Sequence, residues 1–264
     1  MLICEGAGKT FDKGTATEKA ALRGVSLRLE ESDFITVIGG NGAGKSTLLN
    51  AIAGAWPIDE GSIRIGGRDV TRLAEHARAR LIGRVFQDPR MGTAPGMTIE
   101  ENLAIAYRRC KRRTLRWGIR RRERDIYREA LSALGLGLES RLSAKVGALS
   151  GGQRQALTLL MATLQKPKLL LLDEHTAALD PKTAKIVLGL TDRLVSENRL
   201  TTLMVTHNMR DALASGNRIM MMHGGRIILD VRSEEKAGLS VPDLLKMFER
   251  ASGEEIASDR MLLA

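Results

Sequence analysis

A chain of 264 residues is near the size at which a single hydrophobic core stops growing, so we expect one compound domain. No apolar stretch approaches the roughly 18 to 20 residues that cross a bilayer, and we expect neither a membrane span nor an export signal. The net charge of +10 is concentrated in residues 108–124, where ten Lys or Arg accompany one Glu, and the nearly neutral remainder argues against general nucleic-acid binding. Cys4 and Cys110 fit neither a metal-binding spacing nor a disulfide framework, which favours a reducing cytosol.

Short apolar, β-branched runs alternate with longer helical patterns along the chain, as in an α/β fold with a mainly parallel sheet. The unbroken leucines at 169–172 predict a central strand that is buried on both faces. Between Phe86 and Lys168 helical patterns replace the strand pattern, which predicts an inserted helical subdomain. The predicted strands are 25–29, 34–38, 62–65, 82–86, 169–173, 201–206 and 218–222, with a hairpin return strand at 226–231 and a last helix near 241–249.

Residues 39–47 match the phosphate-binding pattern G-x-x-x-x-G-K-[ST] between a predicted strand and a predicted helix at 46–54. Glycines let backbone N–H groups turn inward around phosphates, and the helix start adds partial positive charge. Lys45 would reach the β- and γ-phosphates, and the Ser46 hydroxyl would bind Mg²⁺. A Gly-rich turn alone does not explain Lys-Ser at this offset. We therefore predict an ATP site made by Gly39, Gly40, Asn41, Gly42, Ala43, Gly44, Lys45, Ser46 and Thr47.

Three polar residues at predicted strand ends complete this candidate site. Asp173 is placed to hold Mg²⁺, and Glu174 to polarise the attacking water as a general base. Acidic residues commonly end strands, and a lone histidine after a strand is usually structural. Together with the Lys45 loop, however, Glu174 and His207 become catalytic candidates, with His207 bonding the γ-phosphate.

The segment 148–153, Ala-Leu-Ser-Gly-Gly-Gln, predicts a second helix start. Ser150 and Gln153 form an S-x-x-Q capping box, but Gly151 and Gly152 lower helix stability in the first turn. We interpret these glycines as space for an anion to approach the backbone. Two phosphate-binding helix starts in one chain predict that two copies pair, each completing the other's site.

Taken in this order, the motifs resemble those of the ATP-binding subunits of ABC transporters, over residues 1–235. The resemblance implies an α/β fold, with a P-loop NTPase (RecA-like) core of mainly parallel sheet, an antiparallel β subdomain and an inserted α-helical subdomain. It places the catalytic core with the β subdomain at 1–87 and 166–235, the helical subdomain at 88–165, and a C-terminal helix and tail at 236–264.

The same resemblance implies roles for further residues, with ATP and Mg²⁺ as cofactors. Phe11 occupies the place of the aromatic residue that stacks on adenine, and Gln87 that of the glutamine which senses Mg²⁺ and the membrane subunit. His175 stands where the family usually has Pro, so we expect a looser restraint on Glu174. The residues offered to the partner copy are Ser150, Gly151, Gly152, Gln153 and Asp180; the metal-binding set is Ser46, Gln87 and Asp173; and the catalytic set is Lys45, Glu174 and His207.

By resemblance the protein is a transport ATPase that dimerises around two MgATP and drives separate permease subunits. We expect import of a small solute such as an amino acid, an extracytoplasmic solute-binding protein, and a peripheral location on the cytoplasmic face of the inner membrane. The alternative is a soluble ABC ATPase of nucleic-acid metabolism that uses residues 108–124. Such relatives carry two ATPase domains or a long coiled coil, which this chain lacks, so no nucleic acid is expected.

The basic segment 108–124 has two open interpretations. In the first, it lies near anionic lipid headgroups, where each Lys or Arg contributes roughly 1 kcal/mol to the free energy of membrane binding. In the second, it is a solvated surface of the helical subdomain.

Overall fold

The computed structural model describes residues 1–109, 111 and 118–253. Two compact units can be distinguished by their internal contacts. The first comprises Met1–Ile82, Lys168–Glu174 and the chain from Arg199 onward, and the second comprises Gly83–Pro167 and His175–Asn198. Trp117 and residues 112–116 of the basic segment lie outside the described residues.

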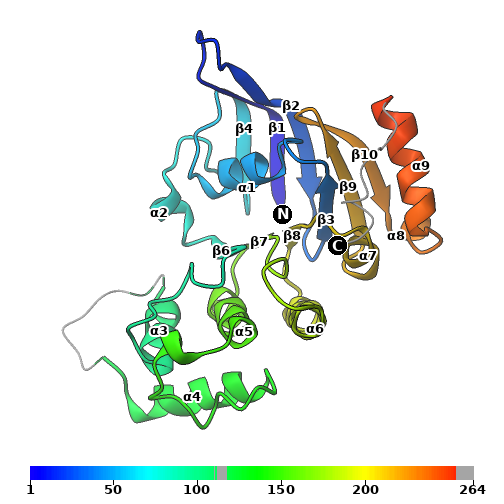
Figure 1. Cartoon of the computed structure of the whole chain (residues 1–264). Coiled ribbons are helices and arrows are strands. Elements are labelled where there is room, and N and C mark those ends of the chain that lie inside the picture. Colours follow the sequence, from blue (N-terminus) through cyan, green and yellow to red (C-terminus); the bar gives the residue numbers. More distant parts are fainter. Residues whose placement is uncertain (110, 112–117, 254–264) are drawn as a thin grey trace. The chain divides into compact units, whose positions relative to one another are not determined.

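A mainly parallel sheet forms the centre of the first unit (Figure 1), as the sequence predicted. The strands of the whole sheet lie in the order β10-β9-β3-β8-β7-β6, and β6 (Ile82–Val85) follows β7 at the boundary of the unit. Parallel pairing joins β3 to β8 and β9, and β7 to β8, while β10 is antiparallel to β9. All four leucines of β7 are fully buried, which confirms a central strand covered on both faces. The strand bounds are β3 (Phe34–Gly39), β7 (Leu169–Asp173), β8 (Thr202–Val205), β9 (Arg218–His223) and β10 (Arg226–Arg232).

A smaller antiparallel sheet completes the first unit, and this confirms the expected β subdomain. Its strand order is β2-β1-β4-β5. The bounds are β1 (Leu2–Phe11), β2 (Lys19–Leu29), β4 (Glu60–Ile65) and β5 (Arg68–Asp69). Its buried side chains, such as Leu2, Leu27 and Ile63, share one core with those of β3 and β7.

The helices of the first unit contribute apolar faces to two cores. Leu48, Leu49 and Ile52 of α1 lie in the main core. Leu244 and Phe248 of α9 pack with residues of β9 in a second core, and Figure 1 shows α9 beside β10. The bounds are α1 (Lys45–Ala53), α2 (Glu75–Arg78), α7 (Met209–Ala214), α8 (Ser233–Lys236) and α9 (Val241–Ser252).

A buried arginine holds the end of α1. The Arg78 side chain is 1% exposed, and its Nη1 donates to the carbonyl oxygens of Ala51 and Ile52 at 2.7 and 2.8 Å. Its Nε and Nη2 donate to the carbonyl oxygens of Leu73 and Thr71. A cation at a helix C-terminus interacts favourably with the helix dipole. Arg78 therefore fixes the helix whose first residue is Lys45.

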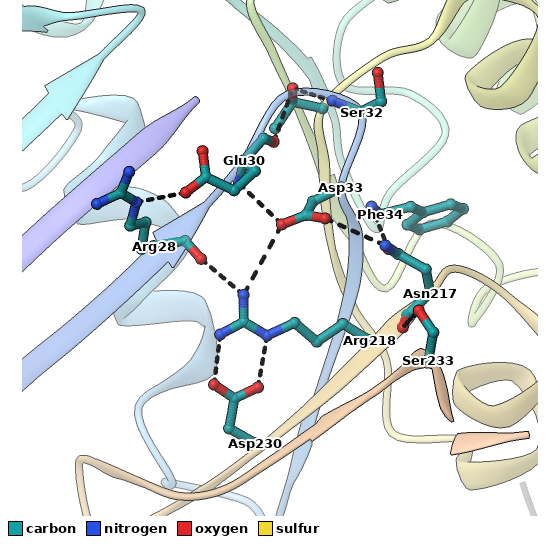
Figure 2. A network of polar contacts seen from close by, with 10 residues as sticks. Arg28, Glu30, Ser32, Asp33, Phe34, Asn217, Arg218, Asp230 and Ser233 are labelled. Atoms are coloured by element: carbon teal, nitrogen blue, oxygen red, sulfur yellow. Dashed lines mark hydrogen bonds and ion pairs between the residues drawn. The ribbon is translucent and has the colours of Figure 1, made fainter. Parts of the chain in front are cut away.

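A polar network fixes the start of β3 (Figure 2). Arg218 of β9 donates from Nε to Asp230 of β10 at 2.6 Å and from Nη1 to the carbonyl oxygen of Arg28 on β2 at 2.8 Å. Asn217 accepts a hydrogen bond from the Phe34 N–H at 2.8 Å and donates to Asp33 at 3.2 Å. Because β3 leads directly into residues 39–47, the network positions the strand that carries the candidate phosphate loop.

The second unit contains the helices of the predicted insert together with α6. Capping boxes start two of them, with Thr98 and Glu101 before α3 and with Ser150 and Gln153 before α5. Within the described residues, no helix is both long and apolar enough to cross a bilayer. The bounds are α3 (Ile99–Tyr107), α4 (Arg121–Ser132), the 3-10 helix η1 (Val146–Ala148), α5 (Gly151–Thr163) and α6 (Pro181–Asn198); β6 (Ile82–Val85) spans the boundary between the units.

Candidate functional site

The register of the parallel sheet brings the catalytic candidates of the first unit to one edge. Val205 of β8 is level with Val37 of β3 and with Asp173 of β7. The backbone N–H of Glu174 donates to the carbonyl oxygen of Val205 at 3.0 Å. The phosphate loop, Glu174 and His207 thus leave three neighbouring strands at the same end, where ligands of open α/β sheets bind.

The loop at residues 39–47 is closed around the Lys45 side chain. Lys45 is 7% exposed, and its ammonium donates to the carbonyl oxygens of Gly39 and Gly40 at 2.8 and 3.1 Å. Gly39 and Gly44 have φ values of 153° and 100°, and a Cβ on them would lie 2.2 Å from Met222 O and 2.5 Å from Ala21 O. Only glycine fits either position.

Charge links Lys45 to the carboxylates at the end of β7. Burial lowers the pKa of the Lys45 ammonium, and the negative charges of Glu174 and Asp173 oppose this shift. The ammonium is held by neutral carbonyl oxygens, so charged phosphate oxygens would be stronger partners for it. This cluster can therefore bind a phosphate chain and act on it.

Glu174 and His207 form a pair at this edge. The Nδ1 atom of His207 lies 3.3 Å from Oε2 of Glu174. The hydrogen bond from His207 lowers the pKa of the Glu174 carboxyl, and the same bond raises the pKa of His207. Glu174 is therefore ionised at neutral pH, as a general base must be. Its φ of 43° is unusual for a residue with a side chain, and such strain clusters at functional sites.

The first unit also holds the predicted adenine contact and two predicted metal ligands. Phe11 ends β1 and packs edge to face against Trp56. The Ser46 side chain is exposed in the first turn of α1, and Asp173 ends β7. Hydroxyl and carboxylate oxygens suit Mg²⁺, so the residues present fit this ion. Gln87, the third predicted ligand, belongs to the second unit.

The start of α5 in the second unit carries the predicted partner-facing residues. Ser150 Oγ accepts from the Gln153 N–H at 3.2 Å and Gln153 Oε1 accepts from the Ser150 N–H at 3.3 Å, which confirms the capping box. Gly151 is exposed, whereas Gly152 is buried. A Cβ on Gly152 would lie 2.0 Å from Cγ2 of Thr183 on α6. Packing against Thr183 therefore requires glycine at position 152. From the sequence we explained this glycine only by the approach of an anion.

Asp180 caps α6. Its Oδ1 accepts a hydrogen bond from the Thr183 N–H at 3.1 Å, and hydrogen bonds from Thr183 lower the pKa of its carboxyl. The charge at this helix start is also favourable to the helix dipole.

A pocket of about 430 Å³ lies within the second unit. Arg154, which follows the capping box, lines it and donates to the carbonyl oxygens of Gly147 and Leu149. Sequence reasoning did not select Arg90 or Arg154 as site residues, because isolated arginines beside a motif give no pattern. The lining residues are Gln87, Asp88, Pro89, Arg90, Gly151, Arg154 and Ala178.

Acidic neighbours neutralise part of the basic segment. Arg108 pairs with Glu123 at 2.9 Å, and Arg124 pairs with Glu100 at 2.7 Å. Exposed pairs of this kind contribute little to stability, but they reduce the free positive charge of this region.

Comparisons with known proteins agree with this geometry. A family model described as ABC transporter matches residues 22–177. A tyrosine transport ATP-binding protein of Clostridioides difficile (strain R20291) is 44% identical over 251 residues, which are 95% of this chain and 100% of the relative. A phosphonates import ATP-binding protein of Rhodopseudomonas palustris (strain BisB18) is 35% identical over 87% of this chain and 84% of its own. A solved ATP-binding cassette, dimeric in a post-hydrolysis state with ADP and Pi, aligns with a TM-score of 0.75 and 30% identity over 88% of this chain and 99% of its own.

Proposed function

Since the chain belongs to the ABC transporter family of ATP-hydrolysing, ATP-binding cassettes, we propose that two copies close around two MgATP to drive import through separate permease subunits. The observation that carries this proposal is the placement of Lys45, Glu174 and His207 at one sheet edge. The match to a tyrosine transport subunit over that relative's full length supports an amino acid as the imported solute.

The chain's own residues supply the chemistry of hydrolysis. The Lys45 ammonium exchanges its two loop carbonyls for β- and γ-phosphate oxygens, while N–H groups of the loop surround the phosphates. The Glu174 carboxylate takes a proton from the attacking water, and His207 orients that carboxylate and donates to the γ-phosphate. Ser46, Asp173 and Gln87 would hold Mg²⁺, which neutralises negative charge on the phosphates.

The second copy supplies the other half of each site. Ser150, Gly151, Gly152 and Gln153 start a 13-residue helix, whose dipole favours the γ-phosphate of the opposing copy. Asp180 caps the neighbouring helix α6 of the same unit. A dimeric cassette among the solved structures supports this arrangement.

Assembly with membrane subunits places the protein at the cytoplasmic face of the membrane, bound peripherally through its permeases. The relatives' names, which describe import and transport subunits, support this location, and an extracytoplasmic solute-binding protein would deliver the solute. Co-purification of the permease, followed by uptake of radiolabelled tyrosine in reconstituted vesicles, tests the cargo. Uptake of an unrelated solute instead of any amino acid would overturn the cargo assignment and leave the ATPase intact.

Substitutions at Glu174 and Lys45 test the proposed mechanism of ATP binding and hydrolysis. We expect Glu174→Gln to retain ATP binding, accumulate an ATP-bound dimer in size-exclusion chromatography, and slow turnover by about 10² to 10⁴-fold, because the amide cannot accept the proton. Lys45→Ala should lose tight binding in nucleotide titrations. Glu31→Gln, which changes an exposed side chain, is the matched control and should keep its activity. Hydrolysis at the normal rate by Glu174→Gln would show that the base is misassigned.

A further inference from the structure

A second aromatic side chain lies against Phe11. The ring centroids of Phe11 and Trp56 are 5.1 Å apart, and the ring planes meet at 83°. Such perpendicular pairs are favourable because the positive edge of one ring meets the negative face of the other. Phe11 has no polar atom that could fix its ring by a hydrogen bond, so its orientation depends on packing.

The backbone ties Trp56 to the phosphate-binding helix. The carbonyl oxygen of Asn50 in α1 accepts hydrogen bonds from the N–H groups of Gly54, Ala55 and Trp56 at 2.9, 3.0 and 3.3 Å. Pro57 follows and restricts the backbone of Trp56 further. The backbone of Trp56 therefore has a fixed position relative to the helix that begins at Lys45.

Asp59 ties the other end of the same turn to β1. Its N–H donates to the carbonyl oxygen of Gly8 at 2.8 Å, and its carboxylate accepts from the Thr10 N–H at 2.7 Å and from Lys9 Nζ at 3.0 Å. The Lys9 ammonium in turn lies 5.5 Å from the centroid of the Phe11 ring. Residues 54–59 thus connect the strand that carries Phe11 with the helix that carries Lys45.

Trp56 keeps 37% of its surface exposed, although burial of an indole is strongly favourable. We propose that Trp56 is a positioning residue for the base of the nucleotide: it holds the Phe11 ring in the orientation on which a purine stacks. This inference rests on the proposed ATP-binding function and deepens it. It assigns recognition of the base, as distinct from the phosphates, to a two-ring platform that neither residue forms alone.

Binding of ligands with and without a base distinguishes positioning of the Phe11 ring from a general contribution of Trp56 to the stability of the fold. Trp56→Leu in the full chain should weaken ATP binding by about 2- to 10-fold, the range that a perpendicular aromatic pair contributes, when measured by calorimetry with Mg²⁺. Binding of inorganic tripolyphosphate, which has no base, should change less than about 2-fold, because the Lys45 loop is intact. Trp56→Phe should restore most of the ATP affinity. Ile105→Ala, which removes an exposed apolar side chain of the second unit, is the control.

Tryptophan fluorescence provides an independent test. The chain has two tryptophans, so Trp56 is the sole reporter in a Trp117→Phe background. ATP should change its fluorescence, whereas tripolyphosphate should leave it nearly unchanged. Equal weakening of both ligands by Trp56→Leu, or no weakening of either, would overturn the inference. Failure of the unmodified chain to bind ATP would overturn the proposed function itself.

Discussion

His175 follows the proposed base Glu174 directly, yet its side chain serves the fold. The ring is 1% exposed, and Nε2 lies 2.9 Å from the hydroxyl oxygen of Thr191 on α6. That hydroxyl already donates its only hydrogen to the carbonyl oxygen of Val187 at 2.9 Å. His175 must therefore be the donor, which assigns the neutral tautomer that carries hydrogen on Nε2. The looser restraint on Glu174 that the sequence led us to expect stays a prediction, while the His175 side chain itself is anchored to α6.

Burial of this neutral ring predicts a dependence of stability on pH. Burial lowers the pKa of His175 from 6.5 to about 4. Between these values the unfolded chain binds a proton that the folded chain does not, so stability falls as the pH drops from 6.5 toward 4. If this histidine acts alone, the full loss below pH 4 is on the order of 3 kcal/mol, of which about 2 kcal/mol falls between pH 7 and pH 5. Chemical denaturation at pH 7 and pH 5 measures this second value.

His175→Gln provides the comparison for that measurement. Glutamine can place a donor near Thr191 but does not titrate, so the variant should lose less stability between pH 7 and pH 5 than the unmodified chain. Carboxyl groups titrate equally in both proteins and cancel in the difference. Parallel curves for the two proteins would mean that His175 is not held neutral in the folded state.

At the scale of elements, the contact between α5 and α6 gives Gly152 two separable reasons to be glycine. One is the proposed approach of a phosphate to the first turn of α5. The other is Thr183, whose Cγ2 methyl lies 2.0 Å from the place of a Cβ. Gly152→Ala should destabilise the protein by about 1 to 3 kcal/mol through overpacking, measured by thermal or urea unfolding.

A double variant separates the two reasons. Thr183→Ser removes the obstructing methyl, so Gly152→Ala combined with Thr183→Ser should regain most of the lost stability. If the glycine also lets an anion approach, ATPase activity should stay low in the double variant. Full recovery of both stability and activity would show that packing alone selects Gly152. Thr183→Ser by itself is the control for the hydroxyl that remains.

Some strands could be predicted from the sequence and others could not, for physical reasons. The four consecutive leucines before Asp173 predicted a strand that matches β7, because a fully buried strand needs no alternation. The strand β1 was not predicted from the sequence. Its pairing with β2 is interrupted by register shifts after Cys4, Ala7 and Lys9, and Gly6 has a φ of 60°, so the alternation that indicates a strand is broken.

At the candidate site too, local motifs could be predicted from the sequence, whereas tertiary contacts could not. The loop around Lys45 and the capping box at Ser150 are contiguous in sequence, so their residue types predict their local geometry. The contact of Trp56 with Phe11 joins segments far apart in the chain and has no sequence pattern of its own. The strained backbone of Glu174 is likewise visible only in the structure.

For the whole molecule, the proposed sharing of sites between copies has a direct test. Lys45 and Glu174 lie in the first unit, whereas the helix start at Ser150 lies in the second. If one chain's Lys45 works with the other chain's Ser150, a chain defective at Lys45 and a chain defective at Ser150 can complement each other. If each chain serves its own nucleotide, they cannot.

Mixing two inactive variants decides between these cases. Lys45→Ala removes the ammonium from the phosphate loop, and Ser150→Arg places a large side chain at the start of α5. Each variant alone should therefore hydrolyse little ATP. In an equal mixture about half of the dimers contain one chain of each kind, and each of these has one intact shared site and one site with both defects. Up to about one quarter of the sites should therefore be intact, and ATPase activity should recover toward that fraction if the two sites act independently. Activity that never rises above that of the separate variants, in mixtures where chromatography shows that the two chains associate, would contradict the shared site and leave each chain to hydrolyse its own ATP.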